Sequence, residues 1–153
     1  WSTSETAVLE RMVDTLHSAE PAAVATFVSV DGSAYRHPGA KMLLTANSDV
    51  GSVTAGCLES EVSHIAEEVR TSGQKRLERF DLTDDEEWGL GIGCNGIVDV
   101  FVEPLDERFV DILERHQTGD DGLAMTVIES SVEEIAVGDR VYTSDGELRG
   151  KEN

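Results

Sequence analysis

The stretch that decides the fold of this chain is Gly51-Ser-Val-Thr-Ala-Gly-Cys-Leu-Glu-Ser60. Its pattern is typical of a strand that ends at a glycine turn and runs directly into a helix. The first turn of a helix presents unpaired N–H donors and a partial positive charge, so it can hold an anion and favours the ionised form of a thiol. We therefore expect a functional site at Gly56 and Cys57.

Helical and strand patterns alternate on both sides of this stretch. Apolar residues at helical spacing predict one helix after the capping box Ser2–Glu5, a second from about Leu58 to Gly73, and a third after Asp106. Strands are predicted at residues 22–30, 41–46, 50–55, 76–82, 97–102, 123–128 and 140–143. This order predicts an α/β fold in which a mixed β-sheet packs against helices, with residues 1–153 as one domain.

Part of the sequence is repeated further along the chain. The matched segments, first copy then second, are residues 10–16 and 107–113, residues 25–28 and 125–128, residues 39–42 and 138–141, and Gly51 and Gly150. Because the order helix, strand, loop, strand, turn is the same in both, we predict a duplicated helix–hairpin unit. The second copy lacks the loop at residues 32–38, so we expect the first copy to carry the function.

Composition limits the class of partner. The chain has 31 acidic and 12 basic residues and a formal charge of −19, with the acidic residues spread along its length. This charge argues against binding to nucleic acid or to anionic membranes. A dispersed acidic surface with few lysines favours a halophilic protein that stays soluble at high salt; an acidic docking face is the alternative.

Apolar segments and the number of cysteines indicate the cellular compartment. No apolar run is long enough to span a bilayer, and no signal peptide is visible. Two cysteines are too few for a disulfide scaffold or a four-cysteine zinc site. We therefore expect a cytoplasmic protein with reduced thiols.

The letters Gly91-Ile-Gly-Cys-Asn-Gly96 match the dinucleotide fingerprint G-x-G-x-x-G. That fingerprint needs a strand before it and a helix after it, whereas here an acidic loop precedes and a β-branched run follows. A glycine loop whose amides approach an oxygen-rich ligand is the better interpretation. A turn that needs positive φ is the alternative.

Four side chains are candidates for chemistry. Cys57 and Cys94 each lie beside glycine, which suits a thiol that a ligand approaches. The alternative is that both cysteines are small buried apolar residues with no contact to a ligand. A zinc site of these thiols with His64 is disfavoured, because close pairs such as C-x-x-C are missing. Arg36 can bind a phosphate or carboxylate with a bidentate fork, or can serve as a structural ion-pair partner.

Three blocks follow one another at residues 32–42 (GSAYRHPGAKM), 51–59 (GSVTAGCLE) and 88–96 (WGLGIGCNG). As a set they resemble the XdhC/CoxI family of accessory proteins for molybdenum hydroxylases. The family usually has Gly-Gly in place of Ala55-Gly56, and Cys-Gly-Gly in place of Cys94-Asn-Gly96. The resemblance implies that Cys57 is the candidate molybdenum contact. The implied cofactor-binding residues are Ser33, Arg36, Gly39, Gly56, Cys57, Glu59, Gly93, Cys94 and Gly96.

The resemblance implies a chaperone that binds molybdenum cofactor, protects it and delivers it to an apo-enzyme of the xanthine or carbon monoxide dehydrogenase type. It also implies a cysteine desulfurase as a further partner, and we consider a homodimer. Family members commonly carry a C-terminal Rossmann-like domain, so this chain resembles the N-terminal half alone. We see no catalytic residues and favour a non-enzyme. A nucleotide-dependent oxidoreductase half and a thiol-based redox or interaction protein are the alternatives.

Overall fold

The computed structural model describes residues 4–33, 38–52, 58–83, 95–120, 122–144 and 147–150. The chain divides into two compact units, Trp1–Leu105 and Asp106–Asn153, and each is described by itself. The expectation of one domain over residues 1–153 stays a prediction. Among the described residues, no helix combines the length and the apolar character that crossing a membrane requires.

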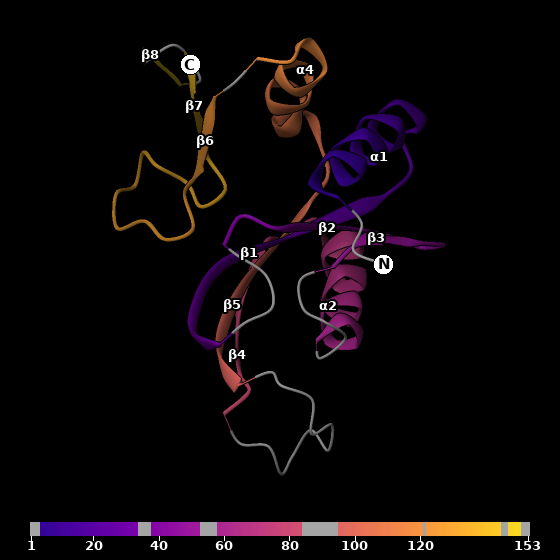
Figure 1. Ribbon diagram of the computed structural model, residues 1–153, viewed down its shortest axis with the longest axis vertical. Coiled ribbons are helices and arrows are strands. Elements are labelled where there is room, and N and C mark those ends of the chain that lie inside the picture. Colours follow the sequence, from indigo (N-terminus) through magenta and orange to yellow (C-terminus); the bar gives the residue numbers. More distant parts are fainter. Residues whose placement is uncertain are drawn as a thin grey trace. The chain divides into compact units, whose positions relative to one another are not determined.

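The first unit is a five-stranded sheet with helices on both sides. Its elements are α1 (Glu5–Ser18), β1 (Ala22–Ser33), β2 (Lys41–Thr45), β3 (Asp49–Gly51), α2 (Glu59–Ser72), β4 (Arg76–Asp81) and β5 (Asn95–Pro104). The strand order is β3-β2-β1-β5-β4. Helix α1 lies on one side of this sheet and α2 on the other (Figure 1). The predicted α/β fold class is confirmed.

The sheet differs from the prediction in one respect. Every described pairing in it is antiparallel, so the mixed sheet expected from the sequence is wrong in that detail. The short connections from β1 to β2 and from β2 to β3 account for the direction of those two pairs, since short turns join antiparallel neighbours. Strand β1 is central because it pairs with β2 along one edge and β5 along the other.

The helices begin and end where local chemistry allows. The Ala7 N–H donates to Ser4 Oγ at 3.2 Å, which caps α1. Helix α2 ends at Gly73, which adopts φ +72° and donates its N–H to the Val69 carbonyl, as the sequence predicted.

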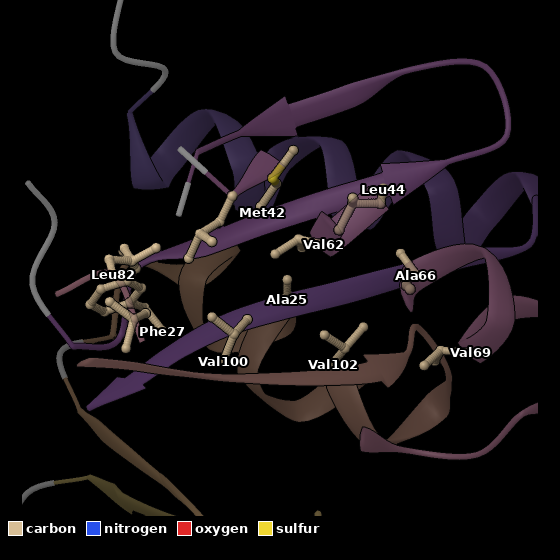
Figure 2. Close-up of a cluster of buried hydrophobic side chains, with 14 residues drawn as sticks. Ala25, Phe27, Met42, Leu44, Val62, Ala66, Val69, Leu82, Val100 and Val102 are labelled. Carbon is tan, nitrogen blue, oxygen red and sulfur yellow. The ribbon is translucent and has the colours of Figure 1, made fainter. Parts of the chain in front are cut away.

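The core of the first unit lies between α2 and the sheet (Figure 2). Val62, Ala66 and Val69 recur at helical spacing along α2 and are fully buried. The strands contribute every second residue, as in Val98, Val100 and Val102 of β5. The buried cluster comprises Ala23, Ala25, Phe27, Ala40, Met42, Leu44, Leu58, Val62, Ala66, Val69, Leu82, Val98, Val100 and Val102.

The second unit is smaller. Its elements are the 3-10 helix η1 (Glu107–Phe109), α4 (Val110–Thr118), β6 (Leu123–Thr126), β7 (Arg140–Ser144) and β8 (Glu147–Gly150), with antiparallel strands in the order β6-β7-β8. Asp106 caps the helical segment as predicted, accepting the Arg108 N–H at 3.0 Å. Phe109 is buried under the Arg140 guanidinium, 4.0 Å from the ring centroid. Strand β8 was not predicted.

Strand register confirms the duplicated unit. In the first copy, Ala25 pairs with Met42, which pairs on its other side with Gly51. In the second copy, Met125 pairs with Val141, which pairs with Gly150. These are the residues that the sequence echo aligns, so the two copies share both element order and register.

The loop bases of the two copies match as well. In the first, the Phe27 N–H donates to the Ala40 carbonyl at 2.9 Å and the Gly39 N–H donates to the Phe27 carbonyl at 2.6 Å. In the second, Val127 bonds in the same way to Asp139 and Gly138, at 2.9 and 2.7 Å. Gly39 and Gly138 both adopt positive φ, +96° and +91°.

We predict that Gly51→Ala destabilises the chain more than Gly39→Ala does. Both glycines adopt positive φ, which costs another residue about 1–2 kcal/mol. A Cβ at Gly51 would also lie 2.6 Å from the Lys41 carbonyl oxygen and 2.9 Å from Val8 Cγ2, whereas Gly39 has open space. Overpacking adds about 1–3 kcal/mol at Gly51. Urea unfolding of both variants measures the difference, and equal losses would contradict the tight packing at Gly51.

Candidate functional site

The first block, residues 32–42, is paired with the other two blocks. At one end it adjoins the third block, since Gly32 pairs with Gly96 and Ser33 with Asn95 where β1 and β5 meet. At its other end Met42 pairs with Gly51, which opens the second block. Segments far apart in the sequence therefore meet on one sheet, with the first block between the other two.

The start of α2 joins the same region through the core. Leu58, which precedes α2, belongs to one buried cluster with Phe27 and Leu82. Leu82 follows β4, and its N–H donates to the Gly96 carbonyl at 2.8 Å. Figure 2 shows Phe27 and Leu82 at the same end of that cluster. The chain positions on either side of the predicted loops are thus tied to one another by pairing and by apolar packing.

Glu59 bridges the two ends of segment 53–57. Its Oε1 accepts the Ser52 hydroxyl at 2.7 Å, and its Oε2 accepts the Leu58 N–H at 3.3 Å. A carboxylate in the first turn of a helix is also stabilised by the helix dipole. Glu59 therefore fixes the distance between the end of β3 and the start of α2, across the segment that carries Cys57.

The structure describes four of the predicted cofactor-binding residues. It brings Ser33 and Gly96 close together, since their backbones occupy successive pairs of the β1–β5 ladder. Gly39 bonds to Phe27, six residues before Ser33 along β1, so it lies away from that pair. Glu59 is held by Ser52 and Leu58. The other predicted residues, Arg36, Gly56, Cys57, Gly93 and Cys94, lie outside the described residues.

A polar tie across three strands was not foreseen from the sequence. Asp99 on β5 accepts the Ser29 hydroxyl of β1 at 2.6 Å and the Nε and Nη2 donors of Arg79 on β4 at 2.7 and 2.9 Å. The Arg79 hydrogen bond lowers the pKa of Asp99 to about 2, against the opposing effect of its partial burial. The tie follows the irregularity between Phe27 and Ser29 and holds the strands that lead to Gly32 and Gly96.

His64 is placed on the surface. Its side chain is 75% exposed, and its Nε2 lies 3.6 Å from Glu68. Among the described residues, no group of three His, Cys, Asp or Glu side chains could hold a metal ion. Cys57 and Cys94 lie outside the described residues, so the disfavoured zinc site stays a prediction.

An open hollow of about 560 Å³ lies where the β2–β3 turn meets α2. Its polar groups bond to one another: Ser63 donates to Asp49 at 3.0 Å, and Arg70 donates to the Thr45 carbonyl at 3.0 Å. His64 lines it, but none of the described cofactor-binding candidates, Ser33, Gly39, Glu59 and Gly96, does. We therefore place the candidate site at the three blocks and not in this hollow.

The chain is similar to known proteins in sequence and in structure. Residues 15–81 match the model of the XdhC and CoxI family. The chain is 37% identical over 96 residues to a probable xanthine dehydrogenase subunit of Bacillus subtilis (strain 168), covering 61% of this chain and 29% of that protein. It is also similar to a solved Bacillus halodurans structure described as a xanthine dehydrogenase, with TM-score 0.76 and 29% identity over 98% of this chain and 45% of that one.

The fold and the paired blocks define an α/β domain with a candidate ligand site on glycine-flanked loops. Residues 15–81, which include the first two blocks, match the model of the XdhC and CoxI family, so the resemblance to that family is confirmed. The chain spans less than half the length of both relatives that it matches.

We predict that Glu59→Ala lowers the free energy of unfolding by about 1–2 kcal/mol, because it removes two hydrogen bonds to a charged acceptor. Hydrogen exchange at the Leu58 amide should speed up in the same variant. Glu61→Ala is the matched control, since Glu61 lies in the same helical turn but accepts the hydroxyl of its exposed neighbour Ser60. That control should change stability by less than about 0.5 kcal/mol. Equal effects of the two substitutions would remove the bridging role of Glu59.

We predict that Asp99 stabilises the fold in a pH-dependent way. A folded pKa of about 2 lies below the unfolded value of about 3.9, so this contribution is complete above that unfolded value and disappears as pH falls through 2. Asp99→Asn should therefore be less stable than the parent chain at neutral pH, with the gap closing in acid. Urea unfolding at stepped pH measures the gap. In an Arg79→Gln background the stability gap at neutral pH should shrink, and an unchanged gap there would exclude the Arg79 bond as its cause.

Proposed function

We propose that this chain binds molybdenum cofactor through its three blocks and delivers it to a molybdenum hydroxylase of the xanthine or carbon monoxide dehydrogenase type. In this proposal the protein acts in the cytoplasm as an accessory protein and not as an enzyme. A cysteine desulfurase and a second copy of the chain are further partners to test. The observation that carries the proposal is the pairing of the first block with both of the others, in a chain with an XdhC and CoxI family segment.

The names of the two relatives support the proposed class of client enzyme. Both are described as xanthine dehydrogenase proteins, and the chain matches only a part of each. Together with the family match, they support an accessory role for molybdenum hydroxylases. The cofactor, the particular client and the delivery step belong to the proposal.

The residue types at the blocks fit the cofactor. Its phosphate suits glycine-loop amides and the fork of Arg36, and its molybdenum suits a thiolate at Cys57, with Cys94 as a second thiol. The described residues add a rigid frame: the Ser33–Asn95 pair on one side, and the Glu59 bridge across segment 53–57 on the other. When bound, the cofactor supplies oxo-transfer chemistry that its client uses, and this chain only holds it.

An oxidoreductase half with a dinucleotide at Gly91–Gly96 is disfavoured. The fingerprint needs a helix that starts at its last glycine, so that the pyrophosphate meets the helix N-terminus. Here Asn95–Pro104 is strand β5, and Gly96 is paired with Gly32 in the sheet. The helix that would bind the pyrophosphate of a dinucleotide is therefore absent after Gly96, where strand β5 continues.

We predict that the chain retains molybdenum cofactor released anaerobically from a molybdenum hydroxylase, and that Cys57→Ser reduces retention at least tenfold. Serine keeps the size of the side chain but removes the soft sulfur ligand. Gel filtration followed by molybdenum and pterin quantification measures retention. Glu61→Gln, in the first turn of α2, should retain as much cofactor as the parent chain.

The two possible negative results of this retention experiment have different meanings. Equal retention by the parent chain and Cys57→Ser would remove the role assigned to that thiol and leave the cofactor proposal standing. No retention by the parent chain would overturn the proposal for this segment. Protection against heat by millimolar NAD(P) or flavin, without cofactor retention, would favour the oxidoreductase alternative.

A further inference from the structure

Strand β1 has a β-bulge in the middle of its pairing with β5. Up to Phe27, the odd-numbered residues of β1 share the face of the buried cluster. The next pair is Ser29 with Asp99, so one extra residue, Val28, lies in β1 between the two pairs. Because successive positions of a strand alternate between faces, the extra residue exchanges them, and beyond it the even-numbered positions take the side of the buried cluster.

This bulge decides which residue of β1 lies beside the third block. With the bulge, Gly32 lies opposite Gly96. Without it, every later residue of β1 would move by one pair, and Asp31 would lie opposite Gly96. Ser29 would then lie opposite Val98 of the buried cluster. The bulge therefore puts a glycine, and not an aspartate, at the junction of the first and third blocks.

The register beyond the bulge depends on β5. On the β2 side, the hydrogen bonds of β1 reach Phe27, which donates its N–H to the Ala40 carbonyl at 2.9 Å and accepts the Gly39 N–H at 2.6 Å. Beyond Phe27, the described pairs of β1 are with β5 alone. Register is weakly specified where strands are rich in glycine, and this ladder has Gly32 opposite Gly96 near its end. A specific contact is therefore needed to fix the register.

The tie of Ser29, Asp99 and Arg79 is such a contact. The three residues lie directly opposite one another on β1, β5 and β4. Asp99, whose side chain is 14% exposed, accepts the Ser29 hydroxyl at 2.6 Å and the fork of Arg79 at 2.7 and 2.9 Å. A slip by one residue would put Val28 opposite Asp99 and bring the Ser29 hydroxyl to the apolar Val98. The tie therefore favours the bulged register.

We propose that Ser29 is a positioning residue: its bond to Asp99 holds β1 in the bulged register, which places Gly32 and not Asp31 opposite Gly96. The register selects for an anionic ligand, because a carboxylate at this junction would repel the phosphate and the molybdenum oxo groups of the cofactor. The effect on the ligand rests on the proposed function, whereas the effect on the register does not.

The test compares Ser29→Val with Ser29→Thr in the whole chain. The two new side chains have the same shape, only threonine keeps the hydroxyl, and Ser29 is exposed, so the added methyl group has room. Cross-strand NOEs between backbone protons report the register, because directly opposite residues are the nearest neighbours across an antiparallel ladder. Ser29→Thr should keep the Gly32–Gly96 contact and full cofactor retention. Ser29→Val should show an Asp31–Gly96 contact and retain at least tenfold less molybdenum cofactor.

A deletion separates the register from a direct contact between the hydroxyl and the ligand. Removing Val28 takes out the extra residue, so Ser29 and the later residues keep their β5 partners without a bulge. Deletion of Val28 combined with Ser29→Val should therefore restore both the Gly32–Gly96 contact and cofactor retention, although the hydroxyl is gone. A double variant that regains the contact without regaining retention would overturn the positioning role of Ser29.

The remaining outcomes separate this proposal from the proposed function. Parent-like NOEs in Ser29→Val would overturn the proposal, and so would an Asp31–Gly96 contact with undiminished retention. No retention by the parent chain would overturn the proposed function, while the NOEs would still decide the register. If circular dichroism shows that Ser29→Val is unfolded, Ser29→Ala takes its place and should show both sets of NOEs. The parent set alone would again overturn the proposal.

Discussion

Strand β1 pairs along its whole length with β5 and along its first half with β2, and the placement of the three blocks depends on this double pairing. The antiparallel ladder runs from the Ala23–Pro104 pair to the Ser33–Asn95 pair. It therefore places the end of the third block beside the start of the first block. The β2 pairing fixes the position of Met42, which in turn pairs with Gly51 of the second block. Without β1 in the centre, the glycine-flanked loops would have no common frame.

Local signals in the sequence predicted much of this fold. The spacing of Val62, Ala66 and Val69 and the stop at Gly73 predicted α2, and a β-branched apolar run predicted β5. Boundaries failed where tertiary pairing overrides propensity: β1 extends to Ser33 and β5 begins at Asn95, because the two strands pair beyond their apolar runs. The short connections indicate antiparallel pairing of β1, β2 and β3, but the direction of the long-range β1–β5 pair has no local signal. Strand β8 was missed for the same reason.

The candidate site could be predicted only in part. The three blocks predicted glycine-rich loops and candidate thiols, because glycine and cysteine have characteristic roles in turns and in ligand binding. They did not predict a hydrogen-bond partner for Glu59. Its bond to Ser52 and the tie of Ser29, Asp99 and Arg79 depend on strand register, which brings together residues up to 70 positions apart. The internal repeat is the exception, because the residues that it aligns pair in the same register in both copies.

The central claim is that the three blocks form one binding site on the frame set by β1. Amide chemical shifts of the uniformly labelled chain, recorded anaerobically as molybdenum cofactor is added, test it most directly. We expect the amides of Ser33, Leu58, Glu59 and Gly96 to shift together along one binding curve, while those of Leu123–Thr126 stay in place. Shifts confined to one block, or shifts centred on the hollow beside Ser63 and Arg70, would contradict a shared site.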